Sequence, residues 1–534
     1  RATAASRGVG RSLAVASPAG AKKAEPFSAE DGRPIGRSSV LNGPNGVNVG
    51  PDGNVYVASV IGDEITVHDP RTGAILDRIG PERGVHGPDD LVVAPDGTIY
   101  WTELVAGNVG LLRPDGSFRT QFVGPGVNPI ELSDDGRLFV ARDFLGDGLY
   151  ELDPELVAPP QVLIPDLVGF NGMDFGPDGL LYGALFFDGA IARVDVDAAM
   201  PEAEVVATGF RVPGAVAFNS AGELHAVDFA EGQVIKVDLA TGHLQLVADI
   251  EGVLDNLAFD ARDRLFTTAF ADGQLLTMTP GGRLRALNKA GFIAPGGVAV
   301  AVDGTVWVAD FFSLRGFGSS RNPDTSYYDR FDPPSAGPAN ANTVSPDGDS
   351  LITTGWFSNS VQVLDADTGE VLQDIRMLAL PLNAIRFGDA LAVAQVGAGN
   401  VVDALSGAEL LGGLSYPLGL ATDGDTLYVS DRASGVVWAV SAGSAEQIAT
   451  DLSAPEGLAV DGSRLLVVEE GLDQVSAIDL ATGAVTPVVE GLDLGSRVIP
   501  TAPPHGIFNG VTVGPDGAIY VSDDGANAVY KFVR

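Results

Sequence analysis

The sequence predicts an all-β protein made of two six-bladed β-propellers, with twelve four-stranded blades and with rings closed by pairing of terminal strands. Two observations lead to this prediction. At 534 residues the chain is too long for one ordinary hydrophobic core. The segment Pro44–Val57 recurs in recognisable form at a period of about 40 to 45 residues, which is within the range of propeller blades.

The repeat is marked by a Pro-Asp-Gly turn or its relic, with an alternating apolar strand on each side. Asp-Gly between such strands is a strong hairpin signal, because glycine accepts the positive φ that these turns need. The twelve turns fall at Gly53, Gly97, Gly136, Gly179, Gly222, Asp263, Gly304, Gly348, Asp389, Asp425, Ser463 and Gly517.

Two further strands follow each hairpin. In the first unit these are 64–69 and 74–79. Four antiparallel strands per unit are typical of a propeller blade. One ring of twelve blades would leave a very wide channel, so we expect two rings of six, with seven plus five as the alternative.

The ends of the chain indicate how the rings close. The last unit stops after its third strand, Val529–Phe532, and a spare strand, Pro34–Val40, precedes the first unit. The simplest layout places residues 33–40 in blade six and 283–287 in blade twelve. It divides the chain into a flexible segment 1–32, a first propeller 33–281 and a second propeller 282–534. In a competing layout the N-terminal strand completes blade twelve.

Composition limits the class of partner. Seventy acidic and 32 basic residues give a formal net charge of −38. A surface of that sign repels phosphate backbones and anionic lipid heads, so we expect no nucleic acid and no membrane partner. The same field attracts cations, although acidity also serves solubility. The sequence leaves the oligomeric state open.

Cysteine is absent, which excludes disulfides, thiolate zinc sites and cysteine nucleophiles and fits an exported or a cytosolic protein alike. Residues 1–32 are rich in Ala, Ser, Gly and Arg and are interpreted as a remnant left after processing. This interpretation favours a secreted or cell-envelope location.

The residue that opens each innermost strand should point at the central channel, and it lies about eight positions before the turn glycine. Most of these residues are Asn, Asp or Glu, whose oxygens suit a hard cation. Strand starts also favour Asn and Asp through local bonds to the backbone, which is the alternative explanation. In the first ring the openers are Asn45, Asp89, Asn128, Asn171, Gly214 and Asp255, and in the second Gly296, Asn340, Asn383, Leu418, Glu456 and Asn509.

From Pro34 onward, the glycine, proline and Asp-Gly spacing resembles the NHL-type and gluconolactonase-like six-bladed propellers, which include senescence-marker and paraoxonase proteins. In those relatives, side chains at the strand starts hold a catalytic divalent metal, often calcium. The resemblance implies a metal site in the second ring at Glu456, Asn509, Asn340 and Asn383, although Gly296 stands where a ligand is expected. The alternative metal set comes from the first ring: Asn45, Asp89, Asn128, Asn171 and Asp255.

Pro504–Ile507 resembles the paraoxonase segment whose histidine acts as a base, so His505 is the first catalytic candidate beside Glu456. A histidine near neutral pKa can deprotonate a metal-polarised water. His86, beside Asp89, is the second candidate. His225 is expected to be packed inside a strand, and His68 to be solvated.

Two long loops favour the second ring as the active one. One runs from Phe311 through Arg321 to Pro334 and the other from Gly491 to Pro504. Aromatic residues after the second strands predict an apolar rim around the channel mouth, with packing between blades or propellers as the alternative. The predicted substrate-binding residues are Phe311, Phe312, Arg315, Tyr327, Tyr328, Trp356 and Phe357. Further rim residues are Phe144, Phe186, Phe187, Phe229 and Phe270.

Three functions follow as hypotheses. The first is a divalent-metal-dependent hydrolase, using Ca²⁺, that acts on a lactone or ester of a fairly apolar small molecule. The second is an eliminating lyase, because Ile99–Glu103 and Gly107–Gly110 resemble the blade signature of virginiamycin B lyase. The third is a non-enzymatic binding propeller with structural cation sites or none.

Overall fold

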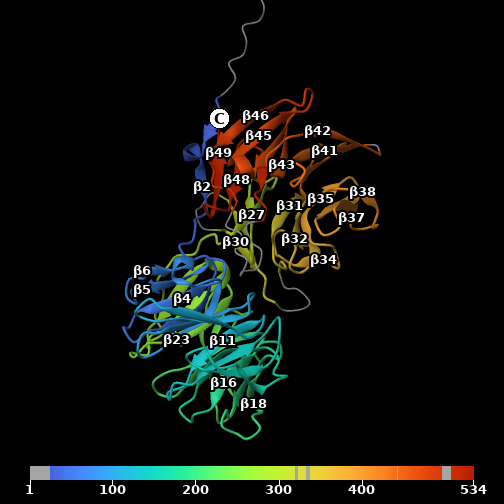
Figure 1. The fold of residues 1–534 in the computed structure, drawn as a ribbon. Helices are drawn as coiled ribbons and strands as arrows, with labels where there is room; N and C mark the ends of the chain where they lie inside the picture. The colour runs from blue at the N-terminus through green and yellow to red at the C-terminus, as the bar shows by residue number, and fades with distance from the viewer. Residues whose placement is uncertain (1–24, 319–322, 332–336, 442, 496–506, 534) are drawn as a thin grey trace, which may run out of the picture.

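The computed structural model describes residues 25–318, 323–331, 337–441, 443–495 and 507–533. In these residues the strands form eleven four-stranded sheets and one five-stranded sheet. The sheets are arranged as two bodies, one blue to green and the other yellow to red (Figure 1). No helix in the described segments is long and apolar enough to span a membrane.

The first propeller contains blades 1 to 6, each with four consecutive strands. Blades 1 to 3 are β3 (Pro44–Val49), β4 (Val55–Ser59), β5 (Glu64–His68), β6 (Ile75–Ile79), β7 (Pro88–Val93), β8 (Ile99–Glu103), β9 (Asn108–Leu112), β10 (Phe118–Phe122), β11 (Val127–Leu132), β12 (Leu138–Arg142), β13 (Leu149–Leu152) and β14 (Gln161–Ile164). Blades 4 to 6 are β15 (Phe170–Phe175), β16 (Leu181–Leu185), β17 (Ala190–Val194), β18 (Ala203–Thr208), β19 (Pro213–Phe218), β20 (Leu224–Asp228), β21 (Gln233–Val237), β22 (Leu244–Asp249), β23 (Leu254–Phe259), β24 (Leu265–Ala269), β25 (Gln274–Met278) and β26 (Leu284–Ala286).

The second propeller contains blades 7 to 12. Blades 7 to 9 are β27 (Pro295–Val300), β28 (Val306–Asp310), β29 (Ser313–Phe317), β30 (Thr325–Tyr328), β31 (Thr343–Asp347), β32 (Ser350–Gly355), β33 (Ser360–Asp365), β34 (Val371–Ile375), β35 (Pro381–Phe387), β36 (Ala390–Gln395), β37 (Asn400–Asp403) and β38 (Glu409–Leu411). Blades 10 to 12 include β39 (Pro417–Thr422), β40 (Leu427–Asp431), β41 (Val436–Ser441), β42 (Ser444–Ala449), β43 (Pro455–Asp461), β44 (Arg464–Glu469), β45 (Gln474–Asp479), β46 (Val485–Glu490), β47 (Val511–Val513), β48 (Ile519–Asp523) and β49 (Ala528–Phe532).

Contacts between innermost strands show two closed rings of six. In the first, each innermost strand contacts the next from β3 to β23, and β23 contacts β3. In the second, the same series runs from β27 to β47, and β47 contacts β27. The division is therefore six plus six, and the predicted all-β fold of two six-bladed propellers is confirmed.

The terminal strand closes only the second ring. Residues Arg33–Ile35 form β2, which pairs antiparallel with β49 and supplies the fourth strand of blade 12. Blade 6 is completed by its own β26, which pairs with β25. The competing layout is the correct one, and the simplest layout is wrong. Residues 33–35 belong to the second propeller, and the first extends to Ala286 rather than 281.

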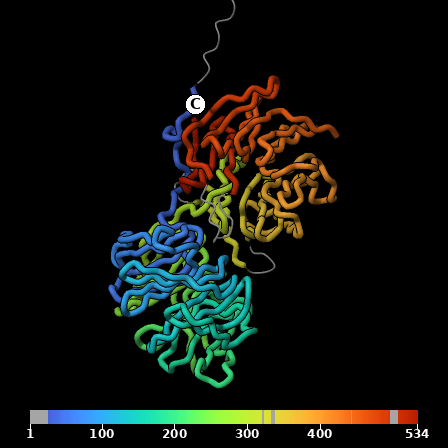
Figure 2. Tube along the Cα trace, viewed as in Figure 1, coloured from blue at the N-terminus to red at the C-terminus, as the bar shows by residue number. Residues whose placement is uncertain are grey.

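Part of the segment predicted to be flexible belongs to the fold. Phe27 and Ser28 form β1, which pairs in parallel with β46 and adds a fifth strand to blade 11. A 3₁₀ turn, η1 (Ala29–Asp31), follows with a capping box formed by Ser28 and Asp31. In Figure 2 the blue N-terminal segment accordingly runs beside the red end of the chain.

Two segments connect the propellers, and they run side by side. The chain leaves the second propeller through residues 36–43 and returns through 287–294. Phe292 donates its backbone N–H to the Arg37 carbonyl at 2.7 Å, and Ser39 donates to the Phe292 carbonyl at 3.0 Å. Ser38 and Phe292 thus form a parallel bridge. The first propeller is therefore an insertion between β2 and β27.

The turns form as the Asp-Gly signal predicts. In blade 1, Gly53 has φ +77° and donates its N–H to the Gly50 carbonyl at 2.9 Å. The Asp52 carboxylate accepts the Asn54 N–H at 3.0 Å. Glycine adopts this φ without steric cost, and aspartate satisfies an amide that the hairpin leaves open. Asp96 and Asp516 accept equivalent amides in blades 2 and 12.

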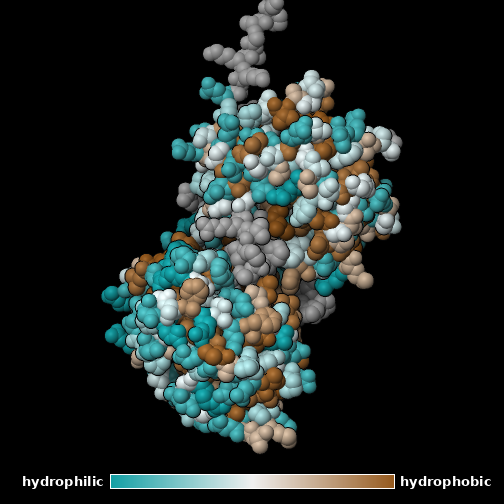
Figure 3. All heavy atoms as spheres, viewed as in Figure 1, coloured by the Kyte–Doolittle hydropathy of each residue, from teal (hydrophilic) through white to brown (hydrophobic). Residues whose placement is uncertain are grey.

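The propellers meet through an apolar cluster, in which side chains from the mouth side of both rings pack together. Phe331 packs edge-to-face on Phe186 and Phe229 of the first propeller and is stacked on Phe312 of the second. Apolar residues of both bodies are visible near the junction in Figure 3. Aromatic pairs of this kind each contribute about 0.5–1.5 kcal/mol beyond their buried area. The cluster's buried members are Ile61, Phe186, Val212, Phe229, Ala230, Val253, Phe270, Ala271, Ile293, Ala294, Phe311, Phe312 and Tyr328.

Candidate functional site: the channel of the first propeller

A hydroxyl at the end of a second strand fixes the opener of the next blade. In blade 2, Thr102 Oγ1 donates to the Asn128 carbonyl of blade 3 at 2.6 Å and accepts the Asp90 N–H at 3.1 Å. Thr268 does the same between blade 6 and Asn45 of blade 1, at 2.5 Å. These bonds hold the innermost strands together, so the opener side chains are presented at the mouth of the channel.

Acidic side chains from several blades gather at the mouth of the first channel. Asp255 accepts a bond from Asn45 Nδ2 at 3.0 Å, and Asp143 Oδ2 accepts one from Asn128 Nδ2 at 3.1 Å. Asp89 is only 6% exposed, and within the described residues it makes no hydrogen bond or ion pair. The other oxygen of Asp143, Oδ1, is buried and has no partner there either. Native proteins rarely leave a buried carboxylate without partners.

A second acidic layer lies behind these openers. Asp90 Oδ1 accepts Asn256 Nδ2 at 3.0 Å, and its Oδ2 accepts the Ile130 N–H at 3.2 Å. Asp90 passes so close to β3 that a Cβ on Gly46 would lie 2.5 Å from its Oδ1. A glycine at that position is therefore required for the Asp90 side chain to reach Asn256.

Burial and mutual repulsion raise the pKa values of these carboxyl groups. The pKa of Asp89 is raised well above its usual value by burial and then by Asp255 and Asp90. Burial and then Asp89 raise the pKa of Asp143 in the same direction. Burial raises the pKa of Asp90 to about 7 and that of Asp255 to about 6. No basic side chain is among the leading causes of these shifts, so no described basic residue neutralises the cluster.

The donor set limits how a metal ion could be held. Among the residues that the structure describes, no three Asp, Glu or His side chains are grouped so that they could hold a metal ion. A cation at this mouth would need amide or backbone oxygens in addition to one or two carboxylates. Asn45, Asn128 and Asn171 supply such amides, and oxygen-only sets of this kind suit calcium.

The channel of the second propeller is built differently. Glu456 Oε2 accepts the backbone N–H and Nδ2 of Asn509 at 2.8 and 3.1 Å, and its Oε1 accepts Arg432 Nε at 3.2 Å. Asn509 thus faces Glu456 with its amide hydrogens, while its Oδ1 accepts the Asp524 N–H at 3.1 Å. Burial raises the pKa of Glu456 to about 8. Glu456 already has a cationic partner, so its surroundings do not call for a metal.

Apolar packing also occupies this mouth. Leu382, Leu418 and Phe508 form one buried cluster that joins blades 9, 10 and 12, with Trp356 packed against it. Blades 9 and 12 lie on opposite sides of the ring, so the cluster crosses the axis. The residues predicted as a metal site in the second ring therefore do not converge on a shared polar point.

Asn340 was predicted as the opener of blade 8, and this is wrong. Gly297 donates its N–H to the Asn342 carbonyl at 2.9 Å, as Gly457 does to Asn509 at 3.1 Å, which identifies Asn342 as the opener. Asn340 lies in the preceding loop at φ +52°, where its Nδ2 donates to the Phe311 carbonyl at 3.0 Å. Asn383 is likewise not the opener of blade 9, because Leu382 holds that position and its carbonyl accepts Thr354 Oγ1 at 3.2 Å. Asn383 is the next residue of β35, and its buried Oδ1 has no partner within the described residues.

Of the two predicted catalytic histidines, only His86 lies within the described residues, and it is not part of either cluster. His505 lies outside the described residues. His86 is exposed on the rim of the first propeller, with Nδ1 3.9 Å from Asp63 Oδ1. His225 is buried in β20 and packs on Phe259, as expected. His68 is fully buried rather than solvated, and its Nε2 lies 2.8 Å from Thr66 Oγ1.

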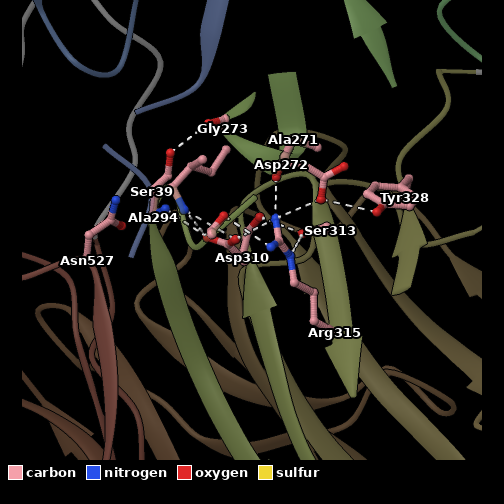
Figure 4. Close-up of polar contacts among 12 residues, drawn as sticks. Ser39, Ala271, Asp272, Gly273, Ala294, Asp310, Ser313, Arg315, Tyr328 and Asn527 are labelled. Carbon is pink, nitrogen blue, oxygen red and sulfur yellow. Dashed lines mark hydrogen bonds and ion pairs between the residues drawn. The ribbon is translucent and has the colours of Figure 1, made fainter. Parts of the chain in front are cut away.

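Most predicted substrate-binding residues lie in the junction between the propellers. Phe311, Phe312 and Tyr328 belong to the apolar cluster described above. Arg315 is buried in β29 and is ion-paired with Asp310 and Asp272 (Figure 4). The predicted long loop after Asp310 is therefore largely β29 and β30, and Arg321 lies outside the described residues.

The remaining three residues of that set have separate positions. Tyr327 is stacked on Trp307, and its hydroxyl donates to the Ala366 carbonyl at 2.9 Å. Trp356 is partly buried and packs against both apolar clusters. Phe357 is 55% exposed.

Sequence reasoning missed Asp143 and Arg432, which occupy the same position in their blades. This is the first residue after the second strand, and in blades 4 to 8 it is aromatic: Phe186, Phe229, Phe270, Phe311 and Trp356. A charged residue at a position that is aromatic in five consecutive blades is the signal that could have identified them.

Comparisons with known proteins give no family assignment. No family model and no curated protein matches the chain. Among solved structures, the chain is similar to a virginiamycin B lyase from Staphylococcus aureus, with 15% identity, a TM-score of 0.38, and coverage of 52% of this chain and 95% of that one. It is also similar to a candidate gluconolactonase, with 16% identity, a TM-score of 0.39, and coverage of 50% and 95%.

A third structure spans both propellers. It is the extracellular domain of a candidate hybrid two-component system from B. thetaiotaomicron, with 10% identity, a TM-score of 0.33, and coverage of 94% of this chain and 82% of that one. At these identities and TM-scores, the likenesses carry no inference about activity or ligands.

Proposed function

We propose that the first propeller is the functional ring and that the mouth of its channel binds a divalent cation of the calcium type. The observation that carries this proposal is the buried Asp89 carboxylate, which lacks any partner among the described residues. Asp143 Oδ1 is a second buried oxygen without a partner. Burying unpaired charge costs several kcal/mol, and a bound cation would offset that cost.

The donors fit this group. Asp89 and Asp255 would supply carboxylate oxygens, and Asn128 and Asn171 would supply amide oxygens. These are hard oxygen ligands without sulfur or imidazole, which favour Ca²⁺ over transition metals. When bound, such an ion polarises the carbonyl of an ester or lactone and stabilises developing negative charge.

The chain's own residues support hydrolysis of an apolar ester or lactone at this mouth. Phe186, Phe229 and Phe270 follow the second strands of blades 4 to 6 and line an apolar rim that excludes water. Asp143 Oδ1 is free to take up a proton, and burial holds the pKa of this carboxyl well above its usual range. A carboxylate whose pKa is raised is a stronger base than an ordinary carboxylate, so Asp143 is the candidate general base.

A second candidate function is a non-enzymatic one, in which the cation only stabilises the ring. Phe331 from the second propeller packs on Phe186 and Phe229 and so covers part of the same rim. In that case calcium would raise the melting temperature, and no substrate would be turned over.

The experiment uses the intact chain freed of metal with EDTA. Calorimetric titration with Ca²⁺ should give saturable binding in the wild type. The control variant Glu202→Gln, which changes an exposed residue, should bind Ca²⁺ in the same way. Asp89→Asn should abolish that binding. Binding that is unchanged in Asp89→Asn would refute the proposed site.

Activity is measured separately on a panel of esters and lactones in ¹⁸O-labelled water. Incorporation of ¹⁸O that depends on Ca²⁺ and on Asp89 supports the hydrolase. A product with a new double bond and no label indicates a lyase instead. Calcium-dependent stabilisation without turnover supports the structural role.

A further inference from the structure

A hydroxyl side chain occupies one particular position in only two blades of the first propeller. The position is the last but one of the second strand, and it holds Thr102 in blade 2 and Thr268 in blade 6. Blades 2 and 6 are also the two blades of this ring whose opener is acidic, Asp89 and Asp255. The other four blades have alanine or valine at this position: Ala58, Ala141, Ala184 and Val227. The hydroxyls therefore accompany the acidic openers.

The hydroxyl of Thr102 connects two neighbouring openers. Its Oγ1 accepts the Asp90 N–H at 3.1 Å and donates to the Asn128 carbonyl at 2.6 Å. The N–H belongs to the peptide group that follows Asp89, and the carbonyl belongs to the peptide group that follows Asn128. One hydroxyl thus fixes both peptide planes, and with them the direction and the separation of the Asp89 and Asn128 side chains.

Thr268 makes the same connection between blades 6 and 1. Its Oγ1 accepts the Asn256 N–H at 3.2 Å and donates to the Asn45 carbonyl at 2.5 Å. These groups belong to the peptides that follow Asp255 and Asn45, whose side chains are themselves hydrogen-bonded at 3.0 Å. Thr102 and Thr268 are both fully buried, so water does not compete for their bonds.

We propose that Thr102 and Thr268 are positioning residues for the candidate cation site, an inference that rests on the proposed function. Each acts through the backbone of the residues that would bind the ion, rather than by contact with the ion. Asp89 and Asp255 repel one another when both are ionised, and the two bridges hold their strands in place against that repulsion. Replacing residues that orient metal ligands typically lowers metal affinity about 10–100-fold.

The second propeller offers a matched control. Ser430 Oγ accepts the Gly419 N–H at 2.7 Å and donates to the Glu456 carbonyl at 2.7 Å, which is the same bridge between blades 10 and 11. Ser430 is also fully buried. Removing its hydroxyl deletes the same two backbone bonds in the ring that is not proposed to bind the ion.

The test measures the Ca²⁺ affinity of the intact, EDTA-treated chain by calorimetric titration. Thr102→Val and Thr268→Val keep the shape of the side chain and remove its hydroxyl, and each should weaken Ca²⁺ binding about tenfold or more. Thr102→Ser and Thr268→Ser keep the hydroxyl and should bind Ca²⁺ with close to the wild-type affinity. Ser430→Ala should bind Ca²⁺ as the wild type does.

Melting curves recorded without calcium separate positioning from a general loss of stability. Thr102→Val, Thr268→Val and Ser430→Ala each leave a buried N–H and a buried carbonyl unpaired, so the melting temperature should fall in all three. Only the two variants of the first propeller should also lose Ca²⁺ affinity. The two threonines lie at different blade boundaries, so either variant answers the question if the other does not fold.

The outcomes distinguish the positioning role from the cation site itself. Wild-type affinity in Thr102→Val and Thr268→Val, together with loss of binding in Asp89→Asn, would overturn the positioning role and leave the cation site standing. An equal loss of affinity in Ser430→Ala would also overturn it, because the effect would not be specific to the first ring. Absence of saturable Ca²⁺ binding by the wild type, or unchanged binding in Asp89→Asn, would refute the cation site and the positioning role with it.

Discussion

Arg315 Nη2 of the second propeller lies 3.3 Å from Asp272 Oδ1 of the first, and this ion pair joins the two rings (Figure 4). The same guanidinium lies 3.1 Å from Asp310 Oδ2 and donates to the Gly291 carbonyl at 3.1 Å. Tyr328 donates its hydroxyl to Asp272 at 3.1 Å. Arg315 is only 2% exposed, so its charge is neutralised inside the junction rather than by solvent.

Arg315→Met is expected to destabilise the chain by about 3–5 kcal/mol, because it leaves the buried carboxylates of Asp310 and Asp272 without their cation. The measurement is chemical denaturation of the intact chain. Arg113→Met is the control, since its partner Glu155 is 65% exposed and such pairs contribute about 0–1 kcal/mol. Similar losses in the two variants would contradict the assigned role of Arg315.

In EDTA, stability should fall as pH rises from about 4 to about 7. Burial raises the pKa of Asp90 from 3.8 to about 7 and that of Asp255 to about 6. In this window the folded state binds more protons than the unfolded state, so its advantage is full below the unfolded pKa and is lost as pH passes the folded pKa. For Asp90 the loss is about 4 kcal/mol.

Melting temperatures across this pH range check the expectation. Asp90→Asn should flatten the dependence, and saturating Ca²⁺ should reduce it, because a bound cation favours the ionised carboxylates. Carboxyl groups with a depressed pKa, such as Asp69 at about 2, change the stability only below about pH 4, which is outside the range from pH 4 to 7. Stability that rises between pH 4 and 7 without calcium would contradict the channel electrostatics.

Glu456→Gln should leave the stoichiometry of bound Ca²⁺ unchanged. Glu456 is paired with Arg432, and the side-chain oxygens of this channel do not converge on one point. Loss of the charge-assisted bonds should lower stability by about 1–3 kcal/mol. Calcium content is measured by elemental analysis and stability by denaturation. A lower calcium content in this variant would indicate that the metal binds in the second ring.

Gly46→Ala is expected to destabilise the first propeller by about 1–3 kcal/mol, because the new methyl group would lie 2.5 Å from Asp90 Oδ1 and 2.7 Å from its Cα. Gly281→Ala is the control, since its Cβ would meet only Thr279 Oγ1 at 3.9 Å. Denaturation curves compare the two variants. Equal stability would show that β3 and β7 are less closely packed than described.

The fold could be predicted because each blade carries its own turn signal, and two rings of six follow from twelve such signals. Ring closure could not be predicted. Arg33–Ile35 and Leu284–Ala286 are both short strands, and only the path of the connections decides which ring each completes. Local sequence does not record that path.

The candidate site was predicted in part. Asp89, Asn128 and Asp255 do open the innermost strands of the first ring, because counting from the turn is accurate where five residues separate the paired strands. In blade 8, Asp347 pairs with Ser350 and only two residues separate them, so the same count gave Asn340 instead of Asn342. The preference for the second ring rested on Glu456 and on two long loops, and the partner of Glu456, Arg432, became apparent only once the strands were in register.

The insertion of the first ring between β2 and β27 has a consequence for modular exchange. Entry and exit of the inserted domain meet at the bridge between Ser38 and Phe292, so the separation between its two attachment points is small. A short peptide could replace residues 44–286 and leave the six blades of the second propeller with all of their strands. Conversely, a different domain with adjacent termini could be inserted at this point. The second propeller would then act as the host domain, and the first as an inserted domain that can be exchanged.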